Sequence, residues 1–159
     1  MSVIRQTEKI AKVSPDLIDE LCSLAVSNDR GKSIALLHSD ETDQVQEMII
    51  ALTPKTFVDR HCTNNQSESM FVLKGSLAMA IFSENGKTFD VVRLANNQTT
   101  SLFGLRLSKK QWLAYMTGDE VTVIHEIACG PFKSNNSEHW ALSDSEVLEV
   151  RKRLELVLF

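Results

Sequence analysis

The residues most suggestive of chemistry lie in one short stretch, HCTNNQSESMFVLKG at positions 61–75. His61 is followed two places later by Thr63, a carboxylate follows at Glu68, and Gly75 closes the stretch. This spacing is that of a metal site in which one ligand has been replaced by threonine. Imidazole and carboxylate ligands together suit iron, manganese, nickel or zinc. The chain therefore holds a metal ion here, or it keeps only the fold that once surrounded one.

The segments that must position these residues are short, apolar and rich in β-forming residues. They lie between about residues 45 and 128 and read EMIIALT, MFVLKG, SLAMAIF, DVVRL, SLFGLRL, WLAYM and VTVIHEIA. Turn-forming pairs separate them, namely Asn85-Gly86, Asn96-Asn97 and Gly118-Asp119. Many short strands without helical crossovers predict a mainly β fold, a sandwich or barrel, and a jelly roll fits best. Residues two apart on a strand point the same way, so position 63 should face the same side as His61.

A helix is expected on each side of the β region. Ser14 can cap a helix over about 14–28, because Pro15 suits its first position and Leu17 begins an apolar face. Ser143 and Glu146 have the spacing of a capping box before a helix over about 143–158. The apolar surface of that helix favours packing on the barrel or on a second subunit. We expect a single domain over residues 1–159 and a homodimer.

Composition excludes several classes of function. The chain has 159 residues, 43% of them hydrophobic and 24% charged, which is average for a soluble globular protein. A net charge of -4 provides no general attraction to nucleic acid or to an anionic membrane. No stretch approaches the roughly 20 apolar residues that cross a bilayer, and no signal peptide is evident. The three cysteines are scattered, so we expect a cytoplasmic protein with reduced thiols.

The stretch from His61 to Gly75 resembles the first motif of the cupin superfamily, which reads His-any-His, three or four residues, Glu, six residues, Gly. ALTPKTFVDRHCT, the hairpin that begins at Phe82, and HEIACGPFKSNNSEHWALSDSE narrow the resemblance to the WbuC-type cupin-fold metalloproteins. These are small bacterial proteins associated with O-antigen and other surface-polysaccharide genes. The similarity covers about residues 14–146, with Gly130-Pro131-Phe132 and Trp140 as its most specific part. It implies a cupin-type β-sandwich or jelly-roll barrel with an N-terminal and a C-terminal helix.

The resemblance implies a four-ligand metal site, which this chain keeps only in part. His61 and Glu68 match the first histidine and the carboxylate, whereas Thr63 stands at the second histidine. The later motif, Pro-Pro-Gly-x-Trp-His, places Leu113 at the last histidine. A mononuclear site normally offers at least three protein donors. We therefore expect no tightly bound cofactor, with His61 and Glu68 as residual ligands of a divalent transition metal as the alternative.

Two further observations concern the pocket. His125 shares a strand face with Val121 and Val123, and it could replace a lost imidazole if that face lined the barrel. The alternative is a histidine packed among apolar neighbours. Glu47 and Asp59 correspond to positions where the family usually has arginines, a reversal that would repel an anionic sugar phosphate.

Other residues near the motifs have simpler interpretations. Tyr115 lies two places after Leu113 and so is expected to line the pocket, where its hydroxyl could bind a sugar. Cys62 should face away from its neighbour His61 for the same geometric reason. His139, beside Trp140, is expected at the surface or in a dimer contact.

These observations support three hypotheses about function. The first is a cupin with a decayed metal site that binds a small polar molecule, such as a saccharide, or a partner protein. Its cavity would be lined by His61, Thr63, Glu68, Tyr115 and His125. The second is an isomerase or epimerase of nucleotide-linked or surface-polysaccharide sugars, metal-dependent or using His61 as base and Tyr115 or Glu68 as acid. The third is a structural or partner-binding dimer module. Whether the protein is an enzyme stays open, and a metal-dependent one is the less favoured.

Overall fold

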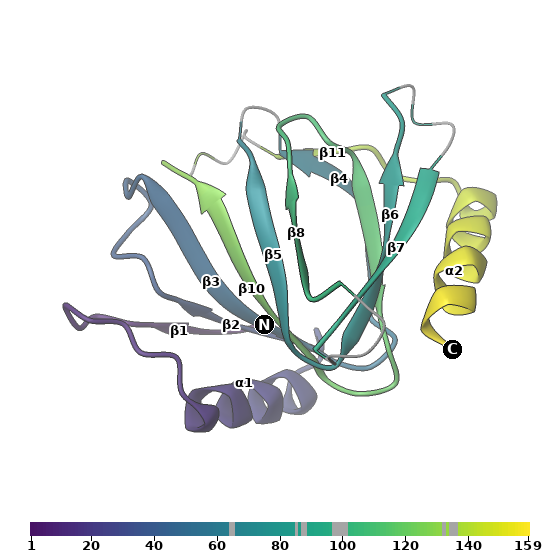
Figure 1. Cartoon of the computed structure of the whole chain (residues 1–159). Helices are drawn as coiled ribbons and strands as arrows, with labels where there is room; N and C mark the ends of the chain where they lie inside the picture. Colours follow the sequence, from purple (N-terminus) through teal and green to yellow (C-terminus); the bar gives the residue numbers. More distant parts are fainter. Residues whose placement is uncertain (64–65, 85, 87–88, 97–101, 132, 134–136) are drawn as a thin grey trace.

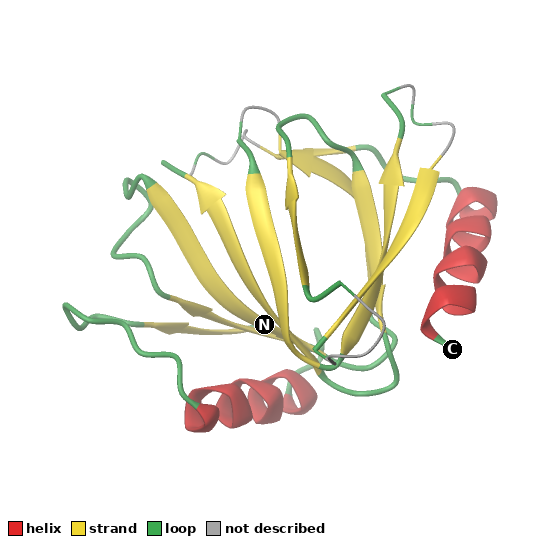
Figure 2. Cartoon of the chain, viewed as in Figure 1, coloured by secondary structure: helices red, strands yellow, loops and turns green. Residues whose placement is uncertain are grey.

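The computed structural model describes residues 1–63, 66–84, 86, 89–96, 102–131, 133 and 137–159, and only the backbone of Thr63 and Ser137. Two β-sheets face each other, and a helix lies outside each of them (Figure 1, Figure 2). The elements are β1 (Ser2–Arg5), α1 (Pro15–Ser27), β2 (Lys32–Leu36), β3 (Val45–Leu52), β4 (Phe57–Thr63), β5 (Glu68–Lys74), β6 (Ser76–Phe82), β7 (Phe89–Ala95), β8 (Gly104–Leu107), β9 (Leu113–Thr117), β10 (Thr122–Cys129), β11 (Ser137–His139) and α2 (Asp144–Leu158).

One sheet has the strand order β1-β2-β3-β10-β5-β8 and the other has β11-β4-β9-β6-β7. The named strands pair antiparallel, except for β1 with β2. Because β10 lies between β3 and β5, the chain crosses repeatedly from one sheet to the other, as in a jelly roll. The predicted mainly β, cupin-type fold with two flanking helices is therefore confirmed.

Both helices begin at the predicted caps. The Ser14 side chain accepts from the Leu17 N–H at 3.3 Å, and Pro15 occupies the first turn. The Glu146 carboxylate accepts from the Ser143 N–H at 2.8 Å in the predicted capping box. The observed helices, Pro15–Ser27 and Asp144–Leu158, lie within one residue of the predicted ranges.

The space between the sheets is an apolar core to which both sheets contribute. It includes Ile50, Leu52, Met70, Val72 and Ile124 from one sheet and Leu77, Met79, Leu113 and Tyr115 from the other. Successive strand residues alternate between this interior and the outer faces. On the outer faces, α1 packs against β2 and β3, and α2 packs against β6, β7 and β9. The interior and exterior of each strand are thereby defined.

The loops bear out the turn signals in part. Gly86 has φ +66, which favours glycine, and its N–H donates to the Ser83 carbonyl at 2.8 Å. Asn85, Asn97 and Phe132 lie outside the described residues. Within the described ranges, no helix is long and apolar enough to cross a membrane.

Candidate binding site in the barrel interior

Polar side chains from both sheets share the interior of the barrel. Glu68 opens β5 and is only 6% exposed. Its partner on β8 is Leu107, a core residue, which places the Glu68 side chain on the interior face. Tyr115, on β9 of the other sheet, is 4% exposed and belongs to the same core. Burial first, and then the charges of Glu126 and Glu68, raise the pKa of the Tyr115 hydroxyl, so these groups lie within electrostatic reach of one another.

Glu126 is a second interior carboxylic acid, on the strand beside that of Glu68. In the ladder between β10 and β5, Glu126 pairs with Met70 and Ala128 pairs with Glu68, so the two acids are diagonal neighbours on one face. Burial raises the pKa of Glu68 to about 7, with a smaller contribution from the Glu126 charge. Burial also raises the pKa of Glu126. Both acids therefore favour the protonated form more than an exposed carboxyl does.

His61 brings an imidazole to the same interior. It pairs with the buried Leu113 on β9, and its ring lies edge-on to Tyr115 with 6.2 Å between the ring centroids. Its Nδ1 lies 2.8 Å from the Asp59 carbonyl oxygen, which can only accept, so Nδ1 carries the proton. Burial lowers the pKa of His61, which favours the neutral ring. In that form Nε2 is a hydrogen-bond acceptor.

Two basic side chains border this group. Lys32, which opens β2, lies close enough that its charge opposes the rise in the pKa of Glu126 and helps to lower that of His61. His139 on β11 pairs with His61 across the sheet, and the two rings stack with centroids 6.0 Å apart. Because His139 is exposed, it lies at the rim of the site, and its expected surface position is confirmed.

The interior acids and the phenol lack hydrogen-bonding partners. Among the described residues, neither the carboxyls of Glu68 and Glu126 nor the hydroxyl of Tyr115 has a hydrogen bond or an ion pair. Their oxygens are not among the fully buried atoms that lack a partner, so they remain open to water or to a ligand. A bound molecule could therefore supply the hydrogen bonds that the described residues do not. We call Glu68, Glu126, Tyr115 and His61 the interior polar group.

The ligand set does not fit a mononuclear metal centre. Among the described residues, no group of three or more His, Cys, Asp and Glu side chains could hold a metal ion. Leu113, opposite His61 in the ladder, is fully buried and has no donor atom. Thr63 ends β4, and its side chain lies outside what the structure describes. Although His61, Glu68 and Glu126 share the interior, they are not grouped as the three donors of such a site would be.

The structure corrects the expected position of His125. On β10 it pairs with Ile49 and Phe71, and Ile49 packs against α1, so His125 points out of the barrel. Its Nε2 lies 2.7 Å from the Glu47 Oε1, also on that outer face. His125 therefore does not line the pocket or replace a lost imidazole. The reason is the alternation of side chains along β10. Ile124 and Glu126 point into the barrel, whereas the face predicted to line it, which includes Val123 and His125, is the outer face.

Glu47 is likewise not a group that repels ligands from inside the barrel, because His125 holds it on the outer face. Asp59 is exposed, its carbonyl holds the His61 ring, and its charge acts on that ring. Sequence reasoning missed Glu126 and Lys32. The available signal for Glu126 was a single carboxylate in an otherwise apolar strand, which is costly unless it faces water or a ligand.

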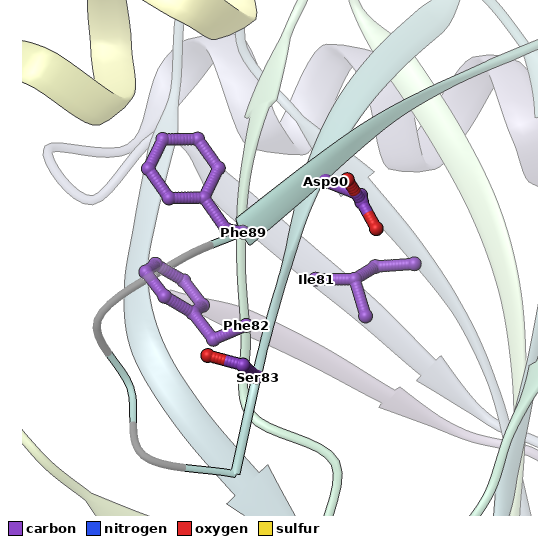
Figure 3. Close-up of a pocket in the computed structure, with 5 residues that line it drawn as sticks. All are labelled: Ile81, Phe82, Ser83, Phe89 and Asp90. Atoms are coloured by element: carbon purple, nitrogen blue, oxygen red, sulfur yellow. The ribbon is translucent and has the colours of Figure 1, made fainter.

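A separate hollow of about 190 Å³ at the β6–β7 hairpin is lined by Ile81, Phe82, Ser83, Phe89 and Asp90. Figure 3 shows the two phenylalanine rings together on one side of the hairpin, with Ile81 and Asp90 on the other. The ring centroids are 5.1 Å apart, and the Arg153 guanidinium lies 4.0 Å from the centre of the Phe89 ring. These rings are already packed against each other and against arginine. The interior polar group is therefore the better candidate for a binding site.

Comparison with protein families and curated sequences gives one match. A family model described as Domain of unknown function (DUF6016) matches residues 13–94, a little over half of the chain. A search of curated protein sequences returned no significant match.

Solved structures resemble between 64% and 88% of this chain. The capsular polysaccharide assembling protein CapF from Staphylococcus aureus is 14% identical, with a TM-score of 0.61 over 72% of this chain and 33% of the CapF chain. Protein SO0799 from Shewanella oneidensis is 13% identical, with a TM-score of 0.61 over 88% of this chain and 93% of that one. The Cnp3 cupin domain from Schizosaccharomyces pombe is 10% identical, with a TM-score of 0.50 over 64% and 63%. This chain spans about a third of the length of CapF, and at these identities the likeness shows the cupin fold alone.

Proposed function

We propose that this chain, which belongs to the family described as Domain of unknown function (DUF6016), is a cupin-fold protein that binds a small polar molecule inside its barrel. One observation carries the proposal: the carboxyls of Glu68 and Glu126 and the hydroxyl of Tyr115 face the barrel interior with no hydrogen-bonding partner among the described residues. A ligand in the interior could hydrogen-bond all three.

The chemistry of the interior polar group favours hydroxyl groups as its partners. Neutral His61 offers an acceptor at Nε2, and Tyr115 offers a donor. Glu68, with a pKa raised to about 7, offers a donor or an acceptor near neutral pH. A saccharide hydroxyl both donates and accepts, so it can satisfy each of these groups. A phosphate suits them poorly, because two acids face it, and only Lys32 and His139 among the described basic side chains act on this group through their charge.

The polysaccharide context has two independent supports. The sequence resembles the WbuC-type cupin-fold proteins, which are associated with surface-polysaccharide genes. The fold resembles CapF, whose own description is a capsular polysaccharide assembling protein. We propose that this chain is WbuC-like and that its ligand is a saccharide unit of such a polymer.

The same proposal holds that no metal is tightly bound. No three described His, Cys, Asp or Glu side chains are grouped so that they could hold a metal ion, and a mononuclear site usually has at least three such donors. Elemental analysis of protein purified without chelators tests this part. One tightly bound transition metal per chain would contradict it and would indicate a functional metal-binding cupin.

An acid–base enzyme acting on sugars is the second candidate. It is favoured by the presence, in one interior, of a neutral imidazole at His61 and of Glu68, whose pKa is raised to about 7, since isomerisation and epimerisation need a base and an acid near neutrality. Incubation with candidate sugars in D₂O distinguishes the two. Deuterium incorporation at a sugar carbon that is lost in His61→Ala would favour the enzyme, and binding without incorporation would favour the binding protein.

Tyr115 provides the direct test of binding, because it is the chain's single tyrosine. Selective ¹³C labelling of tyrosine yields one ring signal from the barrel interior, which can be followed while monosaccharides are added. We expect that signal to shift with the bound fraction. Tyr115→Phe removes that signal, so its affinity is measured by calorimetry; we expect it to fall about tenfold, or about 1.4 kcal/mol, because one hydrogen bond to the ligand is lost.

The matched controls are Glu68→Gln and Glu120→Gln, the second being an exposed acid away from the barrel interior. Loss of affinity in the first and none in the second is expected. A ligand that moves surface signals while the Tyr115 signal stays in place would refute binding in the barrel.

A further inference from the structure

The outward face of α2 carries a row of apolar residues that the barrel does not cover. Leu148 is 56% exposed, Leu156 82% and Phe159 63%. Together with Lys152 and Glu155 they lie on one side of the helix, since about 100° separates successive residues. We call these five residues the outer stripe. Single exposed apolar residues are ordinary, but a contiguous row indicates an interaction surface.

The outer stripe is held facing outward by contacts on the other sides of α2. Val150, Leu154 and Leu158 are buried against the five-stranded sheet, and Figure 1 shows the helix lying along the outside of that sheet. Arg151 places its guanidinium 4.7 Å from the centre of the Phe57 ring, and Arg153 lies over Phe89. The rotation of the helix about its axis is therefore fixed, and the stripe cannot turn inward.

A hollow of about 720 Å³ follows the stripe and is lined by Lys152, Glu155, Leu156 and Phe159. Phe159 is positioned by its own N–H, which donates to the Glu155 carbonyl at 2.9 Å. The hollow and the exposed side chains thus form one surface, with room for apolar side chains from another helix.

We propose that the outer stripe binds the outer stripe of a second copy of this chain, with the two α2 helices antiparallel. The support is a symmetry in the order of residues. Leu148 and Phe159 lie equally far from the point between positions 153 and 154, and so do Lys152 and Glu155. A two-fold axis at that point sets Leu148 against the second copy's phenylalanine and Lys152 against its glutamate. The apolar ends of the stripe thus meet each other, and each charge meets its opposite; Leu156, whose symmetry-related position is Arg151, has no apolar counterpart.

The charges also exclude the parallel arrangement. A parallel pair in register would place Lys152 against lysine and Glu155 against glutamate, and like charges at an interface are unfavourable. The apolar ends of the stripe would gain the same contacts in both arrangements. The two charged residues therefore select the antiparallel one.

One helix pair is a small interface compared with the usual total of about 1,600 Å². We therefore expect a dimer that dissociates on dilution, with a dissociation constant on the order of micromolar. The interior polar group lies on the other side of the five-stranded sheet from α2. Dimer formation and ligand binding are thus separable, and either proposal can fail alone.

Sedimentation analysis of the full chain over a range of concentrations tests the dimer. Lys152→Glu alone and Glu155→Lys alone each bring like charges together, so we expect each to weaken the dimer at least tenfold. The double variant, Lys152→Glu with Glu155→Lys, exchanges the charges and should restore it. Glu149→Lys makes the same charge change on an exposed position outside the stripe and should leave the dimer unchanged.

The result that supports the proposal is loss in both single variants with recovery in the double variant. Three results overturn it: a parent chain that stays monomeric up to about 0.5 mM, a dimer that neither single variant weakens, and loss without recovery in the double variant. Circular dichroism identifies a variant that has unfolded. If a charge variant has unfolded, Leu156→Ser replaces it as the test. This substitution removes the most exposed apolar side chain of the stripe without changing the charge, and it must weaken the dimer for the proposal to stand.

Discussion

Arg60 and Glu68 are buried to nearly the same degree, yet their surroundings are opposite. Arg60 is 2% exposed, and its guanidinium donates from Nε to the Trp140 carbonyl at 3.0 Å and from Nη1 to the Gly86 carbonyl at 3.1 Å. The same group lies 4.3 Å from the centre of the Trp140 ring. Glu68 is 6% exposed and has no such partner among the described residues.

The contrast separates a structural charge from a functional one. Burying a charge is costly unless hydrogen bonds and neighbouring groups compensate for its lost hydration. Arg60 receives that compensation within the fold, and in return it ties β4 to the segment that follows β11. Glu68 receives no such compensation from the described residues, so the stability of the fold does not explain why a carboxyl lies there. Burial by itself therefore does not mark a functional residue here, whereas burial without a partner does.

The largest expected change in stability comes from removing the hydrogen-bonded guanidinium of Arg60. Arg60→Met keeps an apolar stem but removes the guanidinium, leaving the carbonyls of Trp140 and Gly86 without their donor. We expect the free energy of unfolding to fall by about 3–5 kcal/mol, as when one partner of a buried charged contact is removed. Urea unfolding followed by circular dichroism measures it.

The matched control for that experiment is Arg106→Met, at an exposed arginine that donates to the Ser67 hydroxyl at 2.9 Å. We expect a change within about 0.5 kcal/mol there. If both arginine variants were equally stable, Arg60 would not be a structural charge, and the contrast with Glu68 would lose its basis.

The next effect is a dependence of stability on pH that Glu68 should impose. Its pKa is raised from 4.5 to about 7 by folding, so the folded state holds the proton more tightly than the unfolded state. The stability that the protonated Glu68 carboxyl contributes is fully present below pH 4.5 and is lost as the pH rises through 7. We expect this carboxyl to cost at most about 3 kcal/mol of stability above pH 7.

Glu68→Gln isolates that contribution, because the amide does not titrate. The difference in the free energy of unfolding between Glu68→Gln and the parent chain should grow in favour of the variant between pH 4.5 and 7. Glu120→Gln, at an exposed position, should show no such growth. A pH-independent difference for Glu68→Gln would mean that the carboxyl has a partner after all.

The sequence predicted most of the fold because the relevant signals are local. Caps at Ser14 and Ser143, short β-rich segments and a recognisable motif determine the elements and the family of folds. It also predicted His61, Glu68 and Tyr115 as interior residues, from the motif and from the alternation of strand residues. The strands β1, β2 and β11 were not predicted, since each is short and pairs at or near a sheet edge.

The rest of the site depends on register, which is not local. β10 carries apolar residues on both faces, since Ile124 lies in the core between the sheets and Val123 packs in the cluster that includes α1. Periodicity alone cannot then tell which face is inside, and a slip of one residue exchanges His125 with Glu126. Pairing with β3 and β5 settles the face, and those contacts come from distant parts of the chain.

The smallest expected effect comes from comparing a paired and an unpartnered residue on the same strand. His125 and Glu126 are adjacent on β10, but His125 is paired with Glu47 on the partly exposed outer face, and Glu126 is unpartnered inside. His125→Ala should change the free energy of unfolding by less than about 1 kcal/mol, the range of exposed ion pairs, and should leave the affinity for the ligand unchanged. Glu126→Gln should alter that affinity, as followed by the Tyr115 signal. If His125→Ala weakened binding and Glu126→Gln did not, the functional face of β10 would be the outer one, and the paired residue rather than the unpartnered one would mark the site.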